Sequence, residues 1–308
     1  MTALPVTPER HPSLPDPTAP LTASGNLRRR AAVSRLVTLG ASGSALVAVA
    51  LLGDVAGTVA SKGAPALSLD FLTHNPAGLA GGGIANALIG TGLIVTFAAL
   101  IAIPIGVLTG LYLTEFAGPQ SRSGRLLKLV LDLLQGVPTI IVGVFVYGLL
   151  VATTHQETGF AGSVALAIVM LPLIARSSQE VLLLVPSPLR EAADALGVER
   201  WRTVRGVILP AAMGGIATGA ILSIARAAGE TAPLLFVDSI YNPTATQFVI
   251  FGHGVPSIPI YIYTTFDLPS ETAVTAAWGA ALVLLAFILI ANICARVLLA
   301  RTRARMNP

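Results

Sequence analysis

Residues 191–197 read Glu-Ala-Ala-Asp-Ala-Leu-Gly, and after nine further residues the chain continues Val-Ile-Leu-Pro at 207–210. The stretch lies between two strongly apolar segments, 162–185 and 207–237. Each of these segments is long enough to cross a membrane as a helix. A polar segment with small side chains, suspended between two such spans, is typical of a docking element. We therefore expect a membrane protein whose partner binds at this loop.

The composition of the chain is that of a membrane protein. Of its 308 residues, 54% are apolar and only 11% are charged, whereas soluble proteins carry about 25% charged residues. The sequence pI near 9.6 would suit nucleic-acid binding, but the placement of the charges fits membrane topology, so we expect no nucleic-acid partner. The single cysteine, Cys294, excludes a disulfide within the chain.

Six apolar segments are long enough to cross ~30 Å of hydrocarbon, which takes about 20 helical residues. They must be helices, because open strands cannot satisfy their backbone in lipid. The first span follows Arg28-Arg29-Arg30 and is longer than the apolar part of a signal peptide, so we expect it to be retained. Pro104, Pro138 and Pro172 predict kinks or breaks within their spans. The expected spans are Leu36–Ala60, Ile84–Thr114, Leu126–Ala152, Gly162–Val185, Val207–Val237 and Ala273–Leu299.

The basic residues predict the orientation of these spans. Sixteen of the 19 lysines and arginines fall on one side, in both tails and in the second and fourth connections, and Lys62 alone falls on the other. Both termini and the loop at Glu191 are therefore expected in the cytoplasm. The prediction is an all-α integral membrane protein with six transmembrane helices.

A helix is expected over 188–202, starting after the proline pair Pro186 and Pro188. Ala192, Ala193, Leu196 and Gly197 fall close together on its wheel and would form a shallow face that a groove on another protein can approach closely. The alternative is an amphipathic helix on the membrane surface, although lipid insertion favours larger apolar side chains.

The spacing of this loop resembles the EAA loop of permease subunits in binding-protein-dependent ABC importers. The matching residues are Glu191, Ala192, Ala193, Gly197, Leu209 and Pro210, with Val207 where isoleucine is usual. The resemblance implies the type I importer permease fold, with a permease core over 85–300 and a coupling helix over 188–202 that docks on a cytoplasmic ATPase. The other parts would be a disordered tail (1–30), a first span with an outer segment (31–84) and a basic tail (301–308).

A second stretch, Ala-Arg-Ala-Ala-Gly-Glu-Thr-Ala-Pro-Leu-Leu-Phe at 225–236, resembles the signature of the phosphate-specific PstA-type permeases. Residues 85–91, 134–143 and 174–181 add to the likeness. Phosphate as the substrate follows from the resemblance alone. The resemblance also implies a homologous second permease, a cytoplasmic ABC ATPase dimer, an extracytoplasmic phosphate-binding protein and surrounding membrane lipid.

Two Arg/Glu pairs lie inside expected spans: Arg226 with Glu230, and Arg176 with Glu180, each four residues apart. Ionisable groups in a membrane are costly and usually mark pathways, and a guanidinium matches phosphate oxygens. We expect these four residues and Thr231 to line the translocation pathway. The alternative is two structural ion pairs that neutralise each other.

No catalytic or metal site is expected. Neither Lys62 nor Lys128 is followed by serine or threonine, so the chain lacks the lysine of a phosphate-binding loop. ATP and Mg²⁺ would then be bound by the partner ATPase, and the chain would catalyse no covalent step. The histidines are scattered and no cysteine cluster exists, which argues against a metal site.

Three rival functions remain open. The same machinery could carry a phosphonate, sulfate or molybdate. An ion-coupled secondary transporter should show inverted repeats, and no clear repeat is present. A membrane scaffold that reports phosphate status is the third. The outer segment 238–271 is either a re-entrant or surface segment under an external binding protein, or a packed interfacial loop.

Overall fold

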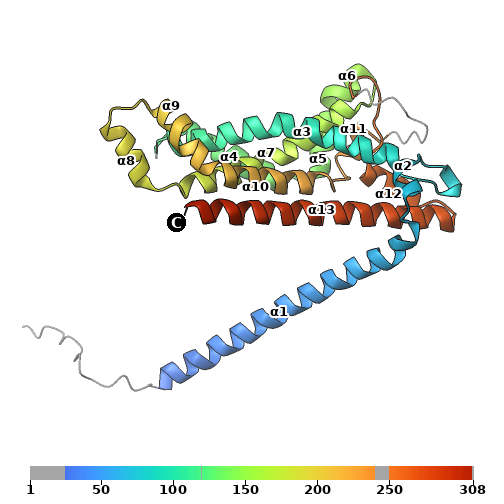
Figure 1. The fold of residues 1–308 in the computed structure, drawn as a ribbon, viewed down its shortest axis with the longest axis horizontal. Coiled ribbons are helices and arrows are strands. Elements are labelled where there is room, and N and C mark those ends of the chain that lie inside the picture. Colours follow the sequence, from blue (N-terminus) through green and yellow to red (C-terminus); the bar gives the residue numbers. More distant parts are fainter. Residues whose placement is uncertain (1–24, 119, 240–249, 307–308) are drawn as a thin grey trace, which may run out of the picture. The chain divides into compact units, whose positions relative to one another are not determined.

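The computed structural model describes residues 25–118, 120–239 and 250–306, and these are almost entirely helical (Figure 1). Their one β contact is an isolated bridge between Pro76 and Gly82. Residues 1–55 and 56–308 form two compact units, which are treated separately. The first holds most of α1 (Gly25–Gly63), a 39-residue helix. The second holds everything that bears on the site.

The second unit contains twelve further α-helices in its described part. They are α2 (Leu69–Thr73), α3 (Ala85–Leu111), α4 (Arg122–Gly136), α5 (Thr139–Val146), α6 (Ala152–Thr154), α7 (Gly159–Leu183), α8 (Ser187–Ala195), α9 (Arg200–Thr203), α10 (Leu209–Ala227), α11 (Leu234–Val237), α12 (Ile258–Phe266) and α13 (Glu271–Met306). Two short 3₁₀ helices are η1 (Ala64–Ala66) and η2 (Gly78–Ala80). Three π-helical turns are η3 (Tyr112–Phe116), η4 (Tyr147–Val151) and η5 (Val204–Ile208).

Five of the expected spans correspond to single helices that are long and apolar enough to cross a membrane. They are Leu27–Ala66, Ala85–Phe116, Gly159–Leu183, Arg200–Ala227 and Glu271–Ala300. One expected span is sharply bent, and one boundary was wrong. The third expected span, Leu126–Ala152, is a pair of helices bent by 102°, and the fifth ends at Ala227 rather than Val237.

A proline explains the first difference. Val137 is extended in front of Pro138, with ψ 127°, and the chain then restarts as α5, because the residue before a proline avoids the helical region. A non-helical turn follows Ala228 and leads to Pro233, which precedes α11. Both segments are mostly apolar, with few charged residues, so an average of hydropathy along the chain does not reveal where the backbone bends.

The core of the second unit is formed by α3, α7 and α10, which run side by side, with α13 alongside α10 (Figure 1). Glycines allow the close approach. A Cβ added to Gly106 or Gly110 would fall within 3.0 Å of Ile174 or of Ser178 on α7, and one added to Gly215 would fall 2.5 Å from Val181. These glycines therefore serve the packing of helices within the chain.

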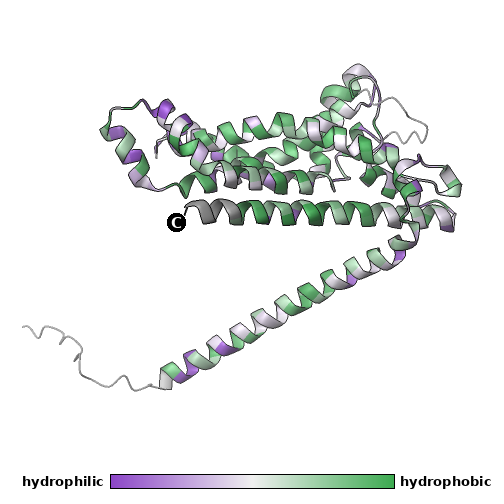
Figure 2. Ribbon diagram, viewed as in Figure 1, coloured by the Kyte–Doolittle hydropathy of each residue, from purple (hydrophilic) through white to green (hydrophobic). Residues whose placement is uncertain are grey.

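Polar and apolar residues separate along the bundle. Figure 2 shows hydrophilic residues gathered on α8 and α9, at one end, and hydrophobic residues along the long helices. At the other end α12 packs against α13, with Tyr261 1% exposed and the Ile258 amide donating to Thr91 Oγ1 at 2.8 Å. The outer segment is therefore packed into the bundle over 255–261, and its residues 240–249 lie outside the described residues.

Candidate functional site

The docking loop is defined as residues 187–203. Its helix α8 has recognisable start and stop signals. Pro188 lies in the first turn of α8, where a missing amide N–H costs nothing. Gly197 has a φ of +67°, its amide donates to Asp194 O at 3.0 Å, and the Val198 amide donates to Ala193 O at 3.1 Å. This pair of bonds around a left-handed glycine is the Schellman motif, which stops a helix.

The single helix expected over 188–202 is therefore wrong. The helix ends at Ala195, and the four-residue helix α9 starts only at Arg200. The expected small-residue face is also divided. Ala193 is buried at 8% exposure, whereas Ala192 and Gly197 are exposed and Leu196 is 81% exposed. The surface that the loop offers outward includes Glu191, Ala192, Leu196, Gly197 and the 52% exposed Trp201.

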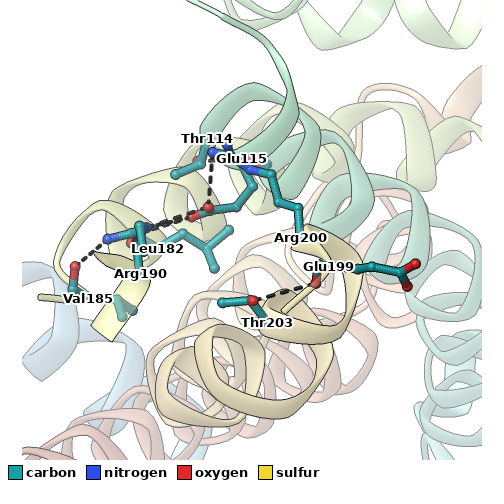
Figure 3. Close-up of polar contacts among 9 residues, drawn as sticks. Thr114, Glu115, Leu182, Val185, Arg190, Glu199, Arg200 and Thr203 are labelled. Carbon is teal, nitrogen blue, oxygen red and sulfur yellow. Dashed lines mark hydrogen bonds and ion pairs between the residues drawn. The ribbon is translucent and has the colours of Figure 1, made fainter. Parts of the chain in front are cut away.

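A buried carboxylate anchors the loop to the bundle (Figure 3). Glu115 lies in the π-helical turn after α3, and its side chain is 2% exposed. Arg190 of α8 donates to Glu115 Oε1 from Nε at 3.2 Å and from Nη2 at 2.8 Å. Arg200 of α9 pairs with the other oxygen at 3.7 Å.

Glu115 was not among the expected site residues. The expected second span ended at Thr114, one residue before it. A lone acidic residue between Leu113 and Phe116, both apolar, was the available signal. Nothing in the spacing pointed to arginines 75 or more residues away.

The base of the loop is a small apolar cluster. Leu182 and Val185 from the end of α7 pack there with Val204 and Ile208 of η5, and Leu209 is half-buried against them. Pro210 is exposed in the first turn of α10. Leu209 and Pro210 thus begin the helix that carries the loop back into the bundle.

Arg226 lines a cavity of about 60 Å³ at the bend between α4 and α5. Its polar neighbours in the lining are Gln135 and Thr139, on the two sides of Pro138, and the wall is completed by α7 residues Val169, Pro172 and Leu173. Two of the stretches that carried the family resemblance, 134–143 and 225–236, thus meet here.

The Arg226–Glu230 pair forms, with Nε 3.7 Å from Oε1. The two residues do not share a helix face as expected, since α10 ends at Ala227 and Glu230 lies in the turn beyond it. The Arg226 side chain is 62% exposed and that of Glu230 is 18% exposed. Thr231 is half-buried in the same turn and is not part of the cavity lining.

The second expected pair was wrong. Arg176 binds Asp132 of α4, not Glu180, and it donates to Gln179 Oε1 at 3.3 Å. Glu180 is exposed and forms no ion pair among the described residues. The spacing of four residues would allow an Arg176–Glu180 ion pair. However, α4 packs against α7, and Asp132 of α4 forms the ion pair with the Arg176 guanidinium instead. Arg176 does not line the Arg226 cavity.

Known proteins resemble the chain over most of its length. The family described as "Binding-protein-dependent transport system inner membrane component" matches residues 102–304. The phosphate transport system permease protein PstA of Pasteurella multocida is 40% identical over 243 residues, covering 78% of this chain and 85% of the relative. PstA of Haemophilus influenzae is 41% identical, covering 78% and 84%. PstA 1 of Mycobacterium tuberculosis strain H37Rv is 38% identical, covering 74% and 73%.

Solved structures of similar fold include two inward-facing crystal forms of the MetNI methionine ABC transporter. Their TM-scores are 0.52 and 0.53 at 21% and 20% identity, and the match covers 70% of this chain and 94% and 93% of the solved chains. This likeness concerns the fold.

Proposed function

The chain belongs to the binding-protein-dependent inner membrane transport components, and among them to the PstA phosphate transport permeases; from this premise we propose how it carries phosphate. The protein is a membrane permease subunit of an ABC transporter for phosphate. Its complex includes an ATPase and a second permease.

Phosphate passes Arg226 at the bend between α4 and α5. The observation that carries this assignment is the grouping of a guanidinium, the Gln135 amide and the Thr139 hydroxyl around one cavity. All three groups can donate to phosphate oxygens, and the planar guanidinium can do so with two parallel bonds. Glu230, 3.7 Å from Arg226, competes for the cation and keeps the anion from binding too tightly to leave. Thr231 follows Glu230 in the same turn and supports its position.

Arg176 and Glu180 have a weaker part in this proposal. The ion pair with Asp132 neutralises Arg176, and neither residue reaches the cavity lining. They shape the neighbouring wall of α7 rather than bind the anion.

The chain crosses the membrane six times, with the bent α4–α5 pair as the third crossing and both termini and the docking loop in the cytoplasm. The charge distribution supports this orientation. Glu191, Ala192, Leu196 and Gly197 contact an ABC ATPase dimer, which binds ATP and Mg²⁺. Ala193, Leu209 and Pro210 support the loop from within. An extracytoplasmic phosphate-binding protein delivers the substrate to the opposite end, and the chain itself performs no covalent chemistry.

The test is uptake of radiolabelled phosphate at low micromolar concentration in cells that lack the gene and then regain it as wild type or Arg226→Gln. We expect wild type to restore uptake, with arsenate as the main competitor and sulfate, molybdate and phosphonates without effect. Arg226→Gln should lower uptake about tenfold or more, since a lost charge-assisted contact is worth about 1.5–3 kcal/mol.

Arg296→Gln is the matched control, because it neutralises an exposed arginine on α13 far along the chain from the cavity. Normal uptake by Arg226→Gln at wild-type protein levels would contradict the pathway assignment. If another anion competes better than arsenate, that anion and not phosphate is the substrate of the same transporter.

A further inference from the structure

Glu115 connects four helical elements through two arginines. It lies at the end of the α3 span, Arg190 belongs to α8, and Arg200 begins α9. The Arg190 guanidinium also donates to the carbonyls of Leu182 at 2.9 Å and Val185 at 2.6 Å, at the end of α7. Figure 3 shows these groups converging between the helix ends.

The chemistry of this cluster makes it strong. Arg190 presents its fork to one carboxylate, and its remaining donors take carbonyls that the end of α7 leaves without helical partners. The negative end of the helix dipole favours a cation at that place. The Glu115 side chain is 2% exposed, and a carboxylate removed from water is stable only while its cation stays. Separating Arg190 from Glu115 would therefore be costly.

The backbone around the loop is weaker than the cluster. Pro186 interrupts the chain between α7 and α8, and residues 196–199 form a non-helical turn between α8 and α9. Without the carboxylate, α8 would be joined to the rest of the chain by these two bends alone, whereas α9 continues through η5 into α10.

We infer that Glu115 is a positioning residue that transmits movement of the docking loop to the transport cavity. It fixes α8 and α9 to the ends of α3 and α7, so that these ends move as one body when the ATPase pulls on the loop. The path continues along α7, which contributes Leu182 to the apolar cluster under the loop and Val169, Pro172 and Leu173 to the wall of the Arg226 cavity. This inference rests on the proposed function.

The test uses the whole complex, with both permeases and the ATPase, reconstituted into liposomes with the phosphate-binding protein. ATP hydrolysis and phosphate uptake are measured together, and the phosphate carried per ATP is compared. For Glu115→Gln we expect this ratio to fall about tenfold while the ATPase still co-purifies and hydrolyses ATP. Glu115→Asp, which keeps the charge, should recover most of the ratio.

Glu199→Gln is the matched control. Glu199 is a glutamate in the same loop, but its pair with Arg202 is exposed on both sides, at 62% and 64%, and exposed pairs contribute little. We expect its ratio to match wild type. An equal loss in Glu199→Gln would overturn the inference, because any charge in the loop would then have the same effect.

A second variant covers the case in which Glu115→Gln does not assemble. Arg200→Gln removes only the exposed and longer of the two contacts and leaves Glu115 paired with Arg190. A partial loss of coupling, with the ATPase still bound, would support the inference, and wild-type coupling in Arg200→Gln would overturn it. If the wild-type complex hydrolyses ATP but carries no phosphate, the proposed function fails, whatever the variants do.

Discussion

At the scale of single residues, Gly197 sets where the docking helix stops. Its φ of +67° is open to glycine but costs other residues about 1–2 kcal/mol. A Cβ there would meet nothing within 4 Å, so the cost of a substitution is conformational and not steric. We expect Gly197→Ala to weaken binding of the ATPase to the permease about 5- to 30-fold, as that energy implies.

The measurement is the affinity of the purified ATPase for the permease in detergent. Gly206→Ala serves as the control, because its Cβ also meets nothing and its backbone is not left-handed. An affinity unchanged by Gly197→Ala would show that the loop binds equally well with its helix end remodelled.

The buried carboxyl of Asp238 should make the stability of the folded protein depend on pH. Burial raises the pKa of its carboxyl well above the ordinary value, against a smaller opposing effect of the Val255 amide, and nearby Glu157 raises it further. Oδ1 accepts from Val255 at 2.7 Å, whereas Oδ2 is buried with no hydrogen-bond partner among the described residues. The folded protein therefore holds this proton more tightly than the unfolded chain, whose pKa is about 3.9.

It follows that Asp238 lowers stability as pH rises from about 4 through its folded pKa. The Asp238→Asn side chain stays neutral at every pH. The thermal midpoint of this variant should therefore rise relative to that of wild type as pH increases from 5 to 8. Thermal unfolding of the detergent-solubilised protein measures this, with the exposed Asp267→Asn as the control. A constant difference between Asp238→Asn and wild type across that range would mean that the carboxyl does not titrate there.

The residue-level errors of the sequence analysis share one cause. The Arg226–Glu230 pair expected from helical spacing forms, although Glu230 lies beyond the end of α10, whereas Arg176 pairs with Asp132 and not with the expected Glu180. Glu115 was overlooked although it organises the loop. Spacing reports neighbours within one helix, and the partners of Arg176 and Glu115 lie on other helices.

At the scale of elements, the bend between α4 and α5 is held by a close contact with the turn after α10. A Cβ on Gly143 would lie 2.7 Å from the Cα of Pro233 and 2.8 Å from its carbonyl oxygen. Because backbone cannot give way as a side-chain tip can, we expect Gly143→Ala to separate α5 from this turn and cost about 1–3 kcal/mol. The Arg226 cavity lies beside this contact, so phosphate uptake should fall as well.

Protein level, thermal midpoint and uptake are measured together for this variant. Gly148→Ala is the control, since it changes a glycine in η4 whose Cβ would meet nothing within 4 Å. Equal behaviour of the two variants would show that α5 and the turn can separate at no cost.

The sequence predicted the helical elements better than their ends. Pro138 was marked as a kink or break, but only the packing of α5 against α7 and α11 decides that the bend reaches 102°. The fifth span was drawn through Ala228–Pro233 because those residues are mostly apolar. Hydropathy indicates whether a segment can lie in an apolar environment, but it does not indicate where the backbone turns.

At the scale of the whole molecule, the orientation can be tested with single cysteines. Cys294 is the only cysteine, so Cys294→Ser gives a background for labelling. Leu196 is 81% exposed in the docking loop, and Asp267 is exposed next to α12 at the other end of the bundle. We expect an impermeant maleimide to label Leu196→Cys only from the cytoplasmic side and Asp267→Cys only from outside. Labelling of both residues from one side would contradict a crossing of the membrane between them, which α10 provides.

The π-helical turn η5 bears on how α9 is rotated about the helix axis relative to α10. It joins α9 to α10 over Val204–Ile208, and such a turn holds one residue more than the α-helix would. Each residue of an α-helix turns the chain by about 100°. Because η5 already takes up its extra residue within one turn, removing Gly206 would restore an unbroken helix and leave α9 facing nearly the same way, whereas removing one residue from α10 would turn α9 by about 100°. A related permease can therefore gain or lose one residue in this turn and still present Trp201 to the same partner.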